Sequence, residues 1–237
     1  MVAKFARIVF ASRKLAVQGR YDDEAWVYSS YQTMTAIEGC GGRFEVAGLE
    51  NLRNLKKPVI FIANHMSTLE TLVLPVLIAP FLRVTFVVKD KLVHGSIFGP
   101  IMKSRNPVTV SRTDPRKDLE TVLSKGKELI DSGCSVIIFP QSTRREVFDR
   151  RQFNSLGVKL ALHAGTEIVP IALKTDFWTN GTILKGFGPL VRSRTIHISF
   201  GPSMAPIGRG KAEHQRTVDF VTTCLESWGA DVEDAAT

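Results

Sequence analysis

A histidine followed five residues later by a carboxylate is the first feature of this sequence that could do chemistry. His65 and Glu70 lie in the segment Asn64-His65-Met66-Ser67-Thr68-Leu69-Glu70, directly after the apolar run Val59–Ala63. A carboxylate that holds one ring nitrogen of a histidine leaves the other nitrogen free to take a proton from a hydroxyl. The pair therefore predicts a general base.

The spacing of the pair also predicts the local structure. Five positions on a continuous helix turn the side chains about 140° apart, so His65 must lie in a turn before the helix begins. Ser67 to Glu70 fit a capping box, with Ser67 as N-cap and Glu70 at position N3. This leaves a purely structural alternative, in which Glu70 only binds the Ser67 backbone N–H and His65 is a polar loop residue.

A second polar cluster, residues 139–144, also follows an apolar run. Arg144 has the forked guanidinium that binds phosphate, and Ser142 or Thr143 can donate to the same group. The alternative for a lone arginine is a surface salt bridge of little energetic value. Because ligands collect at the carboxyl ends of strands in α/β sheets, we expect Arg144 and His65 to open into one cleft.

Short β-rich runs alternate with longer helical stretches from residue 43 onward, which predicts an α/β fold with a mainly parallel or mixed central sheet flanked by helices. Two of the runs are apolar on both faces, as strands covered on both sides should be. The expected strands are Phe44–Val46, Val59–Ala63, Val84–Val88, Pro107–Val110, Val136–Phe139, Ile168–Leu173 and Thr195–Phe200. The expected helices are about Thr68–Ile78, Gly95–Met102, Pro115–Asp131, Gln152–His163 and Lys211–Trp228.

The sequence pattern of residues 1–42 predicts a pair of helices at the N-terminus. A basic amphipathic helix, about Ala3–Val17, precedes an aromatic-rich one, about Asp22–Glu38. The pair fits an interfacial membrane anchor, and equally a pair packed on the core of its own domain. No apolar run approaches the roughly 18 residues of a spanning helix, so we expect a monotopic protein that contacts one leaflet. Residues 230–237 are expected to be a frayed acidic tail.

The composition narrows the class of protein. The 31 Lys and Arg exceed the 23 Asp and Glu, and the net charge of +8 suits an anionic membrane surface or a nucleic acid. Basic and aromatic residues do not interleave, so we expect no nucleic-acid partner. The three cysteines and five histidines show no ligand spacing, which argues against disulfides and a metal and favours a cytosolic environment. No G-x-S-x-G, H-E-x-x-H or G-x-x-x-x-G-K-[ST] motif occurs.

Taken together, these segments resemble the glycerolipid acyltransferase family typified by 1-acylglycerol-3-phosphate acyltransferase, whose signatures are N-H-x-x-x-x-D and F-P-E-G-T-R. The likeness spans about residues 43 to 175, and several blocks in the same order make it specific. The matching residues are Asn64-His65 with Glu70, Phe139-Pro140 with Thr143-Arg144, Lys89-Asp90-Lys91-Leu92 with Gly99-Pro100 and Ser111-Arg112, Val169-Pro170-Ile171-Ala172, and the lead-in Phe44-Glu45-Val46-Ala47-Gly48-Leu49-Glu50-Asn51.

The resemblance implies an acyl transfer without a covalent enzyme intermediate and without a cofactor. His65, oriented by Glu70, would deprotonate a hydroxyl of a lysophospholipid-like acceptor, with 1-acylglycerol-3-phosphate as the first expectation. The donor would be acyl-CoA or acyl-carrier protein, and the reaction would serve phospholipid biosynthesis at the cytoplasmic face of a membrane. Residues 43–229 would form the acyltransferase domain. The residues implied to bind the acceptor are Lys89, Arg112, Gln141, Ser142, Thr143 and Arg144.

Two departures from the family signatures concern the acceptor and the base. Glu70 replaces the usual Asp, which keeps the charge and adds one methylene, so activity is expected to survive. Gln141-Ser142 replaces Glu-Gly, and a neutral amide does not accept as a carboxylate does. The alternatives that follow are a lysolipid acyltransferase with a different acceptor and a non-catalytic, membrane-lipid-binding member of the fold.

Overall fold

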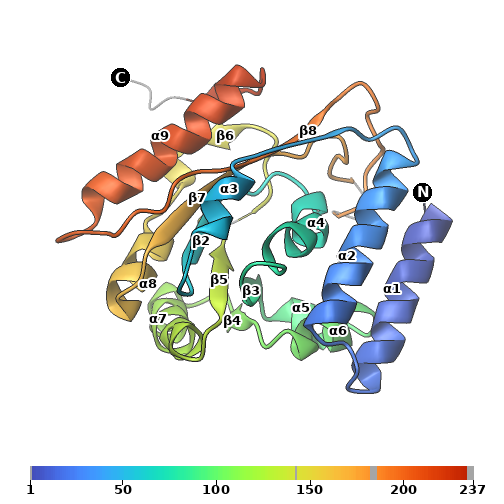
Figure 1. The fold of residues 1–237 in the computed structure, drawn as a ribbon, viewed down its shortest axis with the longest axis horizontal. Coiled ribbons are helices and arrows are strands. Elements are labelled where there is room, and N and C mark those ends of the chain that lie inside the picture. The colour runs from blue at the N-terminus through green and yellow to red at the C-terminus, as the bar shows by residue number, and fades with distance from the viewer. Residues whose placement is uncertain (1, 142, 182–185, 234–237) are drawn as a thin grey trace.

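The centre of the molecule is a seven-stranded sheet with the strand order β1-β8-β7-β2-β5-β3-β4 (Figure 1). The computed structural model describes residues 2–141, 143–181 and 186–233. The strands are β1 (Phe44–Ala47), β2 (Ile60–Ala63), β3 (Val84–Lys89), β4 (Val108–Val110), β5 (Ser135–Ile138), β7 (Ile168–Lys174) and β8 (Ile196–Phe200). All seven predicted strands are present, with ends that differ from the prediction by at most one residue.

The strand directions place the carboxyl ends of five strands at one edge of the sheet. Neighbours among β7, β2, β5, β3 and β4 pair in parallel. Strand β8 is antiparallel to β7, and β1 is parallel to β8, so the sheet is mixed. The polar segments after β2 and β5 therefore emerge side by side, as the sequence predicts.

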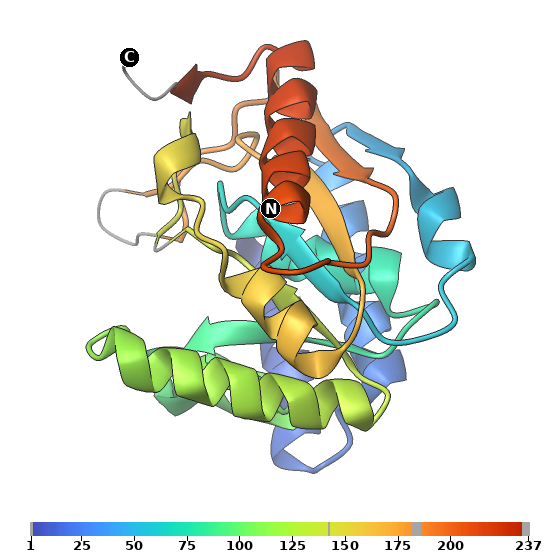
Figure 2. The same ribbon diagram turned by 90° about the vertical axis from the view of Figure 1, so that its left-hand side faces the viewer.

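Helices cover both faces of the sheet. The helices are α1 (Val2–Val17), α2 (Asp23–Glu38), α3 (Leu49–Arg53), α4 (Leu69–Ile78), α5 (Lys91–His94), α6 (Phe98–Ser104), α7 (Pro115–Asp131), α8 (Leu156–Ala164) and α9 (Lys211–Ser227). Figure 2 shows α7, α8 and α9 together on one side of the sheet. Helices α1, α2 and α4 lie on the other side (Figure 1).

Successive side chains of β2 point to opposite faces of the sheet and belong to two hydrophobic cores. Ile60 and Ile62 of β2 pack with the buried residues of α7, α8 and α9. Phe61 and Ala63 of the same strand pack with those of α1, α2 and α4. All four residues of β2 are buried, which explains why the strand is apolar throughout.

The N-terminal helical pair packs on the domain and also exposes an outer face. Phe5 and Val9 of α1 are buried in the core, and α1 contacts α2 and α6. Ser30 of α2 donates to Leu72 O and accepts from Val76 N, which fastens α2 to α4. The outer face leaves large hydrophobic side chains exposed, among them Phe10, Val17, Tyr28 and Tyr31.

The C-terminal segment differs from its prediction as a frayed tail. Strand β9 (Val232–Glu233) pairs in parallel with β6 (Phe148–Asp149), a strand that the sequence did not predict. Phe148 N donates to Asp231 O over 3.1 Å, so backbone pairing holds the start of the segment. The expectation is wrong for β9, and residues 234–237 lie outside the described residues.

Two predicted helices begin later than expected, and two short helices were not predicted. The helix expected from Gly95 begins at Phe98. The helix expected from Gln152 begins at Leu156, because a 3-10 turn over Arg150–Gln152 precedes it and the Asn154 side chain binds Leu156 N. The short helices α3 and α5 were not predicted. Each has five residues or fewer, too short to show helical periodicity.

Candidate active site

His65 and Glu70 meet at the tip of β2. His65 Nδ1 lies 2.8 Å from Glu70 Oε1. Helix α4 begins at Leu69 after Thr68, so His65 lies in the preceding turn, as its spacing predicts. The His65 side chain is 15% exposed and that of Glu70 is 0% exposed. The imidazole is thus open to solvent while the carboxylate that holds it is not.

Glu70 makes both of the interactions that the sequence suggests, with the helix-capping backbone and with the His65 ring. It accepts from the backbone N–H groups of Met66 and Ser67, which is the capping interaction, and it also binds the His65 ring. The Ser67 hydroxyl donates to it over 3.1 Å, and Thr175 Oγ1 donates to its second oxygen. Burial raises the pKa of Glu70, but the hydrogen bonds from His65 and the other donors outweigh burial and leave the pKa below its ordinary value. Glu70 is therefore a fixed, ionised partner of the imidazole.

The histidine ring and its loop are held from further sides. The His65 ring stacks on Phe139, with centroids 4.3 Å apart and planes inclined by 20°. Asn64 fixes the end of β2 against β7, because its side chain donates to Leu173 O and accepts from Leu173 N. Asn180 Nδ2 donates to Met66 O over 2.9 Å. A turn tied in this way keeps the ring in one orientation.

Gln141 binds the histidine backbone. Its Oε1 accepts from His65 N over 2.7 Å, and the residue is 2% exposed. A second hydrogen bond joins the same two segments, because Arg145 N donates to His65 O over 2.9 Å. The amide oxygen of Gln141, implied by resemblance to bind the acceptor, is thus engaged by the protein itself.

Arg144 lies beside the same turn. Its Nη1 donates to Thr68 Oγ1, three residues after His65. A Cβ added at Gly186 would lie 3.3 Å from Arg144 Nη1, so a glycine there leaves room for the guanidinium. Desolvation lowers the pKa of Arg144, and the nearby Glu70 opposes this shift. The imidazole and the guanidinium therefore share one edge of the sheet, as the sequence predicts.

The other residues implied to bind the acceptor lie at the same edge but further along it. Lys89 ends β3, and Arg112 follows β4 with a φ of 62°. The Arg112 backbone N–H donates to Asp118 Oδ2 over 2.7 Å, which fixes this turn against α7. Thr143 is exposed, and Ser142 lies outside the described residues. Gln141 and Arg144 thus contact the His65 turn through their side chains, Gln141 at His65 N and Arg144 at Thr68.

Sequence reasoning missed Thr175 and Thr68. Thr175 follows β7, a strand whose carboxyl end lies at the same edge, so its position was the available signal. Its contact with Glu70 joins residues 105 positions apart and has no local signature. Thr68 was assigned only to the capping box.

The site therefore combines a buried carboxylate that orients an accessible histidine with an arginine at the carboxyl edge of an α/β sheet. The family profile described as Acyltransferase matches residues 43–174. A 1-acyl-sn-glycerol-3-phosphate acyltransferase of Pseudomonas aeruginosa is 32% identical over 189 residues, which cover 79% of this chain and 68% of that protein. The chain therefore belongs to the acyltransferase family.

Two further comparisons agree. A chloroplastic 1-acyl-sn-glycerol-3-phosphate acyltransferase of Arabidopsis thaliana is 30% identical over 131 residues, which cover 55% of this chain and 36% of that protein. The crystal structure of the 1-acyl-sn-glycerophosphate acyltransferase PlsC from Thermotoga maritima superposes with a TM-score of 0.70 at 18% identity, covering 96% of this chain and 92% of that one. The structural likeness confirms the predicted fold, and the family match confirms the predicted O-acyltransferase class.

Proposed function

We propose that this enzyme transfers a fatty acyl group from a thioester, carried by acyl-CoA or acyl-carrier protein, to the free hydroxyl of a lysophosphatidate-like acceptor. One observation carries the proposal: buried Glu70 holds His65 Nδ1 at 2.8 Å, while the ring stays open to solvent beside Arg144. The printed names of the relatives support the choice of acceptor.

The contact between His65 and Glu70 supports one proton path for the transfer. With Nδ1 bound to Glu70, Nε2 of His65 takes the proton of the acceptor hydroxyl as its oxygen attacks the thioester carbonyl. The new ester C–O bond forms, the C–S bond breaks, and the imidazolium returns its proton to the leaving thiolate. The products are the acylated acceptor and a free thiol. Ionised Glu70 stabilises the imidazolium, and no acyl-enzyme forms.

Arg144 is proposed to bind the acceptor phosphate. A guanidinium binds a phosphate through two parallel hydrogen bonds, and the Thr68 contact holds this one beside the base. Positioning the hydroxyl next to His65 in this way can contribute several orders of magnitude to the rate. Thr143, Arg112 and Lys89 are proposed to extend the phosphate site along the sheet edge. Because the Gln141 amide oxygen already binds His65 N, the change from Glu does not by itself require a different acceptor.

The lipid substrate places the reaction at a membrane surface. Among the residues that the structure describes, none of the helices combines the length and the apolar character that crossing a bilayer requires. Helix α1 exposes Phe10 and Val17 beside Arg7 and Lys14, a mixture that suits the boundary between acyl chains and lipid phosphates. We propose a monotopic enzyme on the cytoplasmic face of the membrane.

Release of free thiol tests the proposal. Wild-type protein given acyl-CoA and 1-acylglycerol-3-phosphate should release thiol and form the diacyl product. His65→Ala should lose about 10²–10⁴-fold in rate, the usual contribution of a general base. His94→Ala is the matched control, since His94 is an exposed histidine paired with Asp90, and this variant should retain activity.

If His65→Ala releases thiol as fast as wild type, the assignment of the base is wrong. Vesicle binding without thiol release from any lysolipid would instead indicate a non-catalytic lipid-binding protein.

A further inference from the structure

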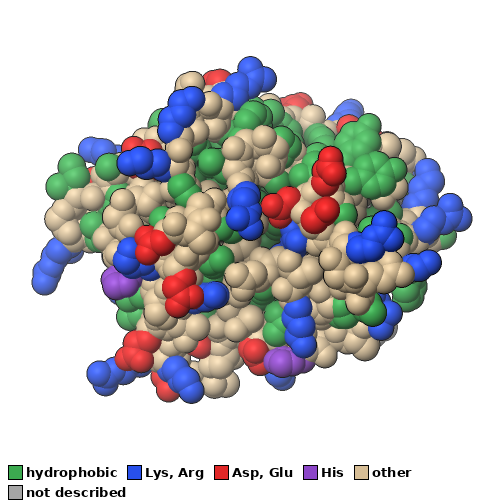
Figure 3. Space-filling model, turned by 60° about the horizontal axis from the view of Figure 1, so that its bottom comes forward, with side chains coloured by type: hydrophobic (Ala, Val, Ile, Leu, Met, Phe, Trp, Pro, Cys, Tyr) green, Lys and Arg blue, Asp and Glu red, His purple; other side chains and the backbone are tan. Residues whose placement is uncertain are grey.

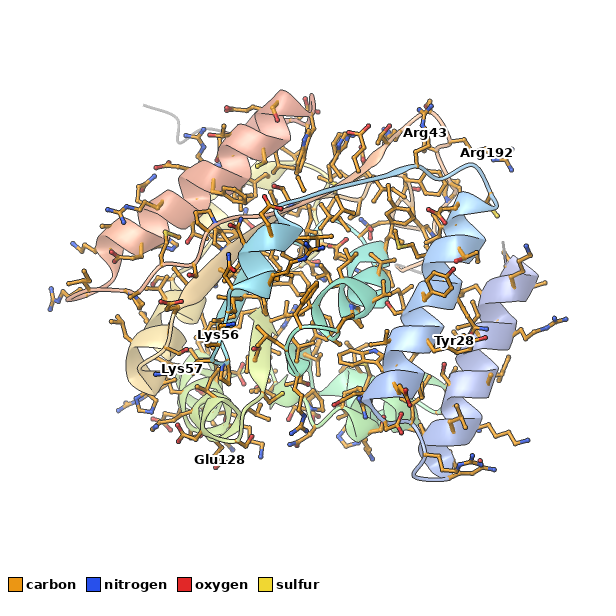
Figure 4. All side chains as sticks on the ribbon, in the orientation of Figure 1. Tyr28, Arg43, Lys56, Lys57, Glu128 and Arg192 are labelled. Atoms are coloured by element: carbon orange, nitrogen blue, oxygen red, sulfur yellow. The ribbon has the colours of Figure 1, made fainter. Side chains whose placement is uncertain are left out.

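Glu70 is a carboxylate that the fold removes from water. Its side chain is 0% exposed, whereas Glu128 of α7 points outward in Figure 4. Figure 3 shows further Asp and Glu side chains exposed on the lower face of the molecule. Water donates hydrogen bonds to such surface carboxylates, but a buried carboxylate depends on donors of the protein. The donors that contact Glu70 therefore decide where its two oxygens lie.

These donors divide between the two oxygens. Oε1 lies 2.8 Å from His65 Nδ1 and accepts from the backbone N–H groups of Met66 and Ser67. Oε2 accepts from the Thr175 hydroxyl and lies 3.1 Å from Ser67 Oγ. Among the residues that the structure describes, Thr175 is the one donor to Glu70 from outside the His65 turn. One oxygen of Glu70 thus faces the imidazole, and the other is tied to the end of β7.

The end of β7 holds Thr175 in a fixed place. Thr175 directly follows the strand, which pairs in parallel with β2, and the Asn64 side chain joins the two strands at Leu173. Thr175 is fully buried, and its N–H donates to Met66 Sδ over 3.3 Å. Its Oγ1 also lies 2.8 Å from Ser67 Oγ. The sheet therefore presents the hydroxyl to Glu70 in one position.

A second fixed point matters for a side chain of this length. Glu70 has one methylene more than the Asp of the family signature, so one more torsion must be fixed before the carboxylate faces the ring. Contacts at Oε1 alone leave the plane of the carboxylate free to turn, because the last torsion of Glu is broad. Ser67 also approaches Oε2, but it belongs to the same turn as His65 and moves with it. Thr175 is the contact that fixes the carboxylate relative to the sheet.

We propose that Thr175 is a positioning residue of the acyl transfer, whose hydroxyl fixes the plane of the Glu70 carboxylate so that Oε1 faces His65 Nδ1. This inference rests on the proposed function and adds a residue to its machinery. Because Thr175 is buried, it acts through Glu70 and not on the substrates. Burial raises the pKa of Glu70, and the hydrogen bonds from His65 and Thr175 lower it, so the same contact keeps the carboxylate ionised.

Two replacements that differ in shape and in hydrogen bonding test the proposal. Thr175→Val keeps the shape of the side chain and removes the hydroxyl. It should lower kcat by about 10–100-fold, because small shifts of a reacting group are expensive, and should leave KM for palmitoyl-CoA and for 1-acylglycerol-3-phosphate unchanged. Thr175→Ser returns the hydroxyl and should restore most of kcat. A residue needed only for packing would give the opposite order, with the Val variant active and the Ser variant impaired.

Thr85→Val is the matched control. Thr85 is also buried, and its hydroxyl donates to Arg105 O over 2.7 Å. It lies near the start of β3, at the edge of the sheet opposite to the site, where Lys56 and Lys57 precede β2 (Figure 4). The control removes a buried hydroxyl and its hydrogen bond, so urea unfolding should show a loss of stability. Its kcat should equal that of the wild type.

A double-mutant cycle tests whether Thr175 acts through Glu70. In a Glu70→Ala background the contact is already lost, so Thr175→Val should lower kcat no further. A second pair, Thr175→Ala and Thr175→Ser, also differs in the hydroxyl and serves if Thr175→Val does not fold.

Three results would overturn the role of Thr175. They are a wild-type kcat in Thr175→Val, the same loss of kcat with and without Glu70, and equal kcat values for Thr175→Ala and Thr175→Ser. Failure of the proposed function is distinct, since the wild type itself would then release no thiol from palmitoyl-CoA.

Discussion

The amide oxygen of Gln141 accepts a hydrogen bond from the backbone N–H of His65 over 2.7 Å. The bond joins the tips of β2 and β5, and Arg145 N completes the link by donating to His65 O. Gln141 therefore fixes the backbone from which the His65 ring projects, and we propose that it is a positioning residue. Glu, the residue that the family signature has at this position, also carries side-chain oxygens that accept hydrogen bonds.

Two replacements of Gln141 should distinguish the effect of losing its accepting oxygen from the effect of adding a charge. Gln141→Leu leaves the buried His65 N–H without a partner, which costs about 1–3 kcal/mol of unfolding free energy. It should also lower kcat by up to about 10²-fold, because small shifts of a reacting group are expensive. Gln141→Glu keeps an accepting oxygen and should retain most of the activity. Urea unfolding and steady-state kinetics measure both effects. Equal kcat values for wild type and Gln141→Leu would contradict the positioning role.

Glu70 should make the stability of the protein depend on acid pH. Its pKa in the folded protein lies below the ordinary value of 4.5, so the unfolded chain binds the proton more readily. The stability that ionised Glu70 contributes is therefore complete above about pH 4.5 and is lost as pH falls through the folded-state pKa. Glu70→Gln has no ionisable group at this position, so residue 70 adds no pH dependence to the stability of the variant. The difference in unfolding free energy between wild type and Glu70→Gln should shrink from pH 6 toward pH 3, a series that urea titrations can follow.

Asp118→Asn provides the control for this series. Desolvation raises the pKa of Asp118, but hydrogen bonds from the backbone of Ser111 and Arg112 outweigh it and lower the pKa overall. The variant should remove a second part of the acid sensitivity, and it keeps the contact between His65 and Glu70. A difference between wild type and Glu70→Gln that stays constant down to pH 3 would show that the Glu70 carboxylate is not stabilised in its ionised form.

Local pattern was enough to predict the elements and the two polar clusters of the site. Helix α7 has the predicted ends, because Pro115 and the Asp114 cap define its start in the sequence itself. His65 and Arg144 were placed at one edge because both follow buried strands, and parallel strands end together. These inferences needed only residue order and the periodicity of apolar residues.

The remaining features depend on contacts between distant residues. The sequence does not show that β7 and β5 flank β2, so it could not reveal that Thr175 binds Glu70 or that Gln141 binds His65. The pairing of β6 with β9 was missed for the same reason, because each strand has two residues and no alternation to detect. Tertiary hydrogen bonds of this kind leave no local signature.

Two glycines with left-handed backbones should differ in their tolerance of alanine. Gly48 has a φ of 77°, and an added Cβ would lie 1.9 Å from Phe200 O, an atom of the β8 backbone. Gly133 has a φ of 85°, and nothing lies within 4 Å of its added Cβ. Gly133→Ala should therefore cost only the conformational penalty of about 1–2 kcal/mol. Gly48→Ala should cost about 1–3 kcal/mol more, because backbone atoms must move. Equal unfolding free energies of the two variants would contradict the close approach at Gly48.

The two faces of α1 should respond differently to the loss of a phenylalanine. Phe5 is 8% exposed, and its ring meets those of Trp178 and Phe187 with centroids 5.3 Å and 5.8 Å apart. Phe5→Ala should therefore destabilise the protein by about 3 kcal/mol, measured by urea unfolding. Phe10 is 58% exposed, so Phe10→Ala should change stability by less than about 0.5 kcal/mol.

Binding to anionic vesicles completes the comparison. Phe10→Ala should weaken vesicle binding about tenfold or more, since a phenylalanine that enters the acyl boundary contributes about 1.5–3 kcal/mol. Arg7→Ala on the same face should weaken it in a salt-dependent manner, because each cation near an anionic surface contributes about 1 kcal/mol. If Phe10→Ala binds vesicles as tightly as wild type, the exposed face of α1 does not enter the membrane and the proposed orientation of the enzyme is incorrect.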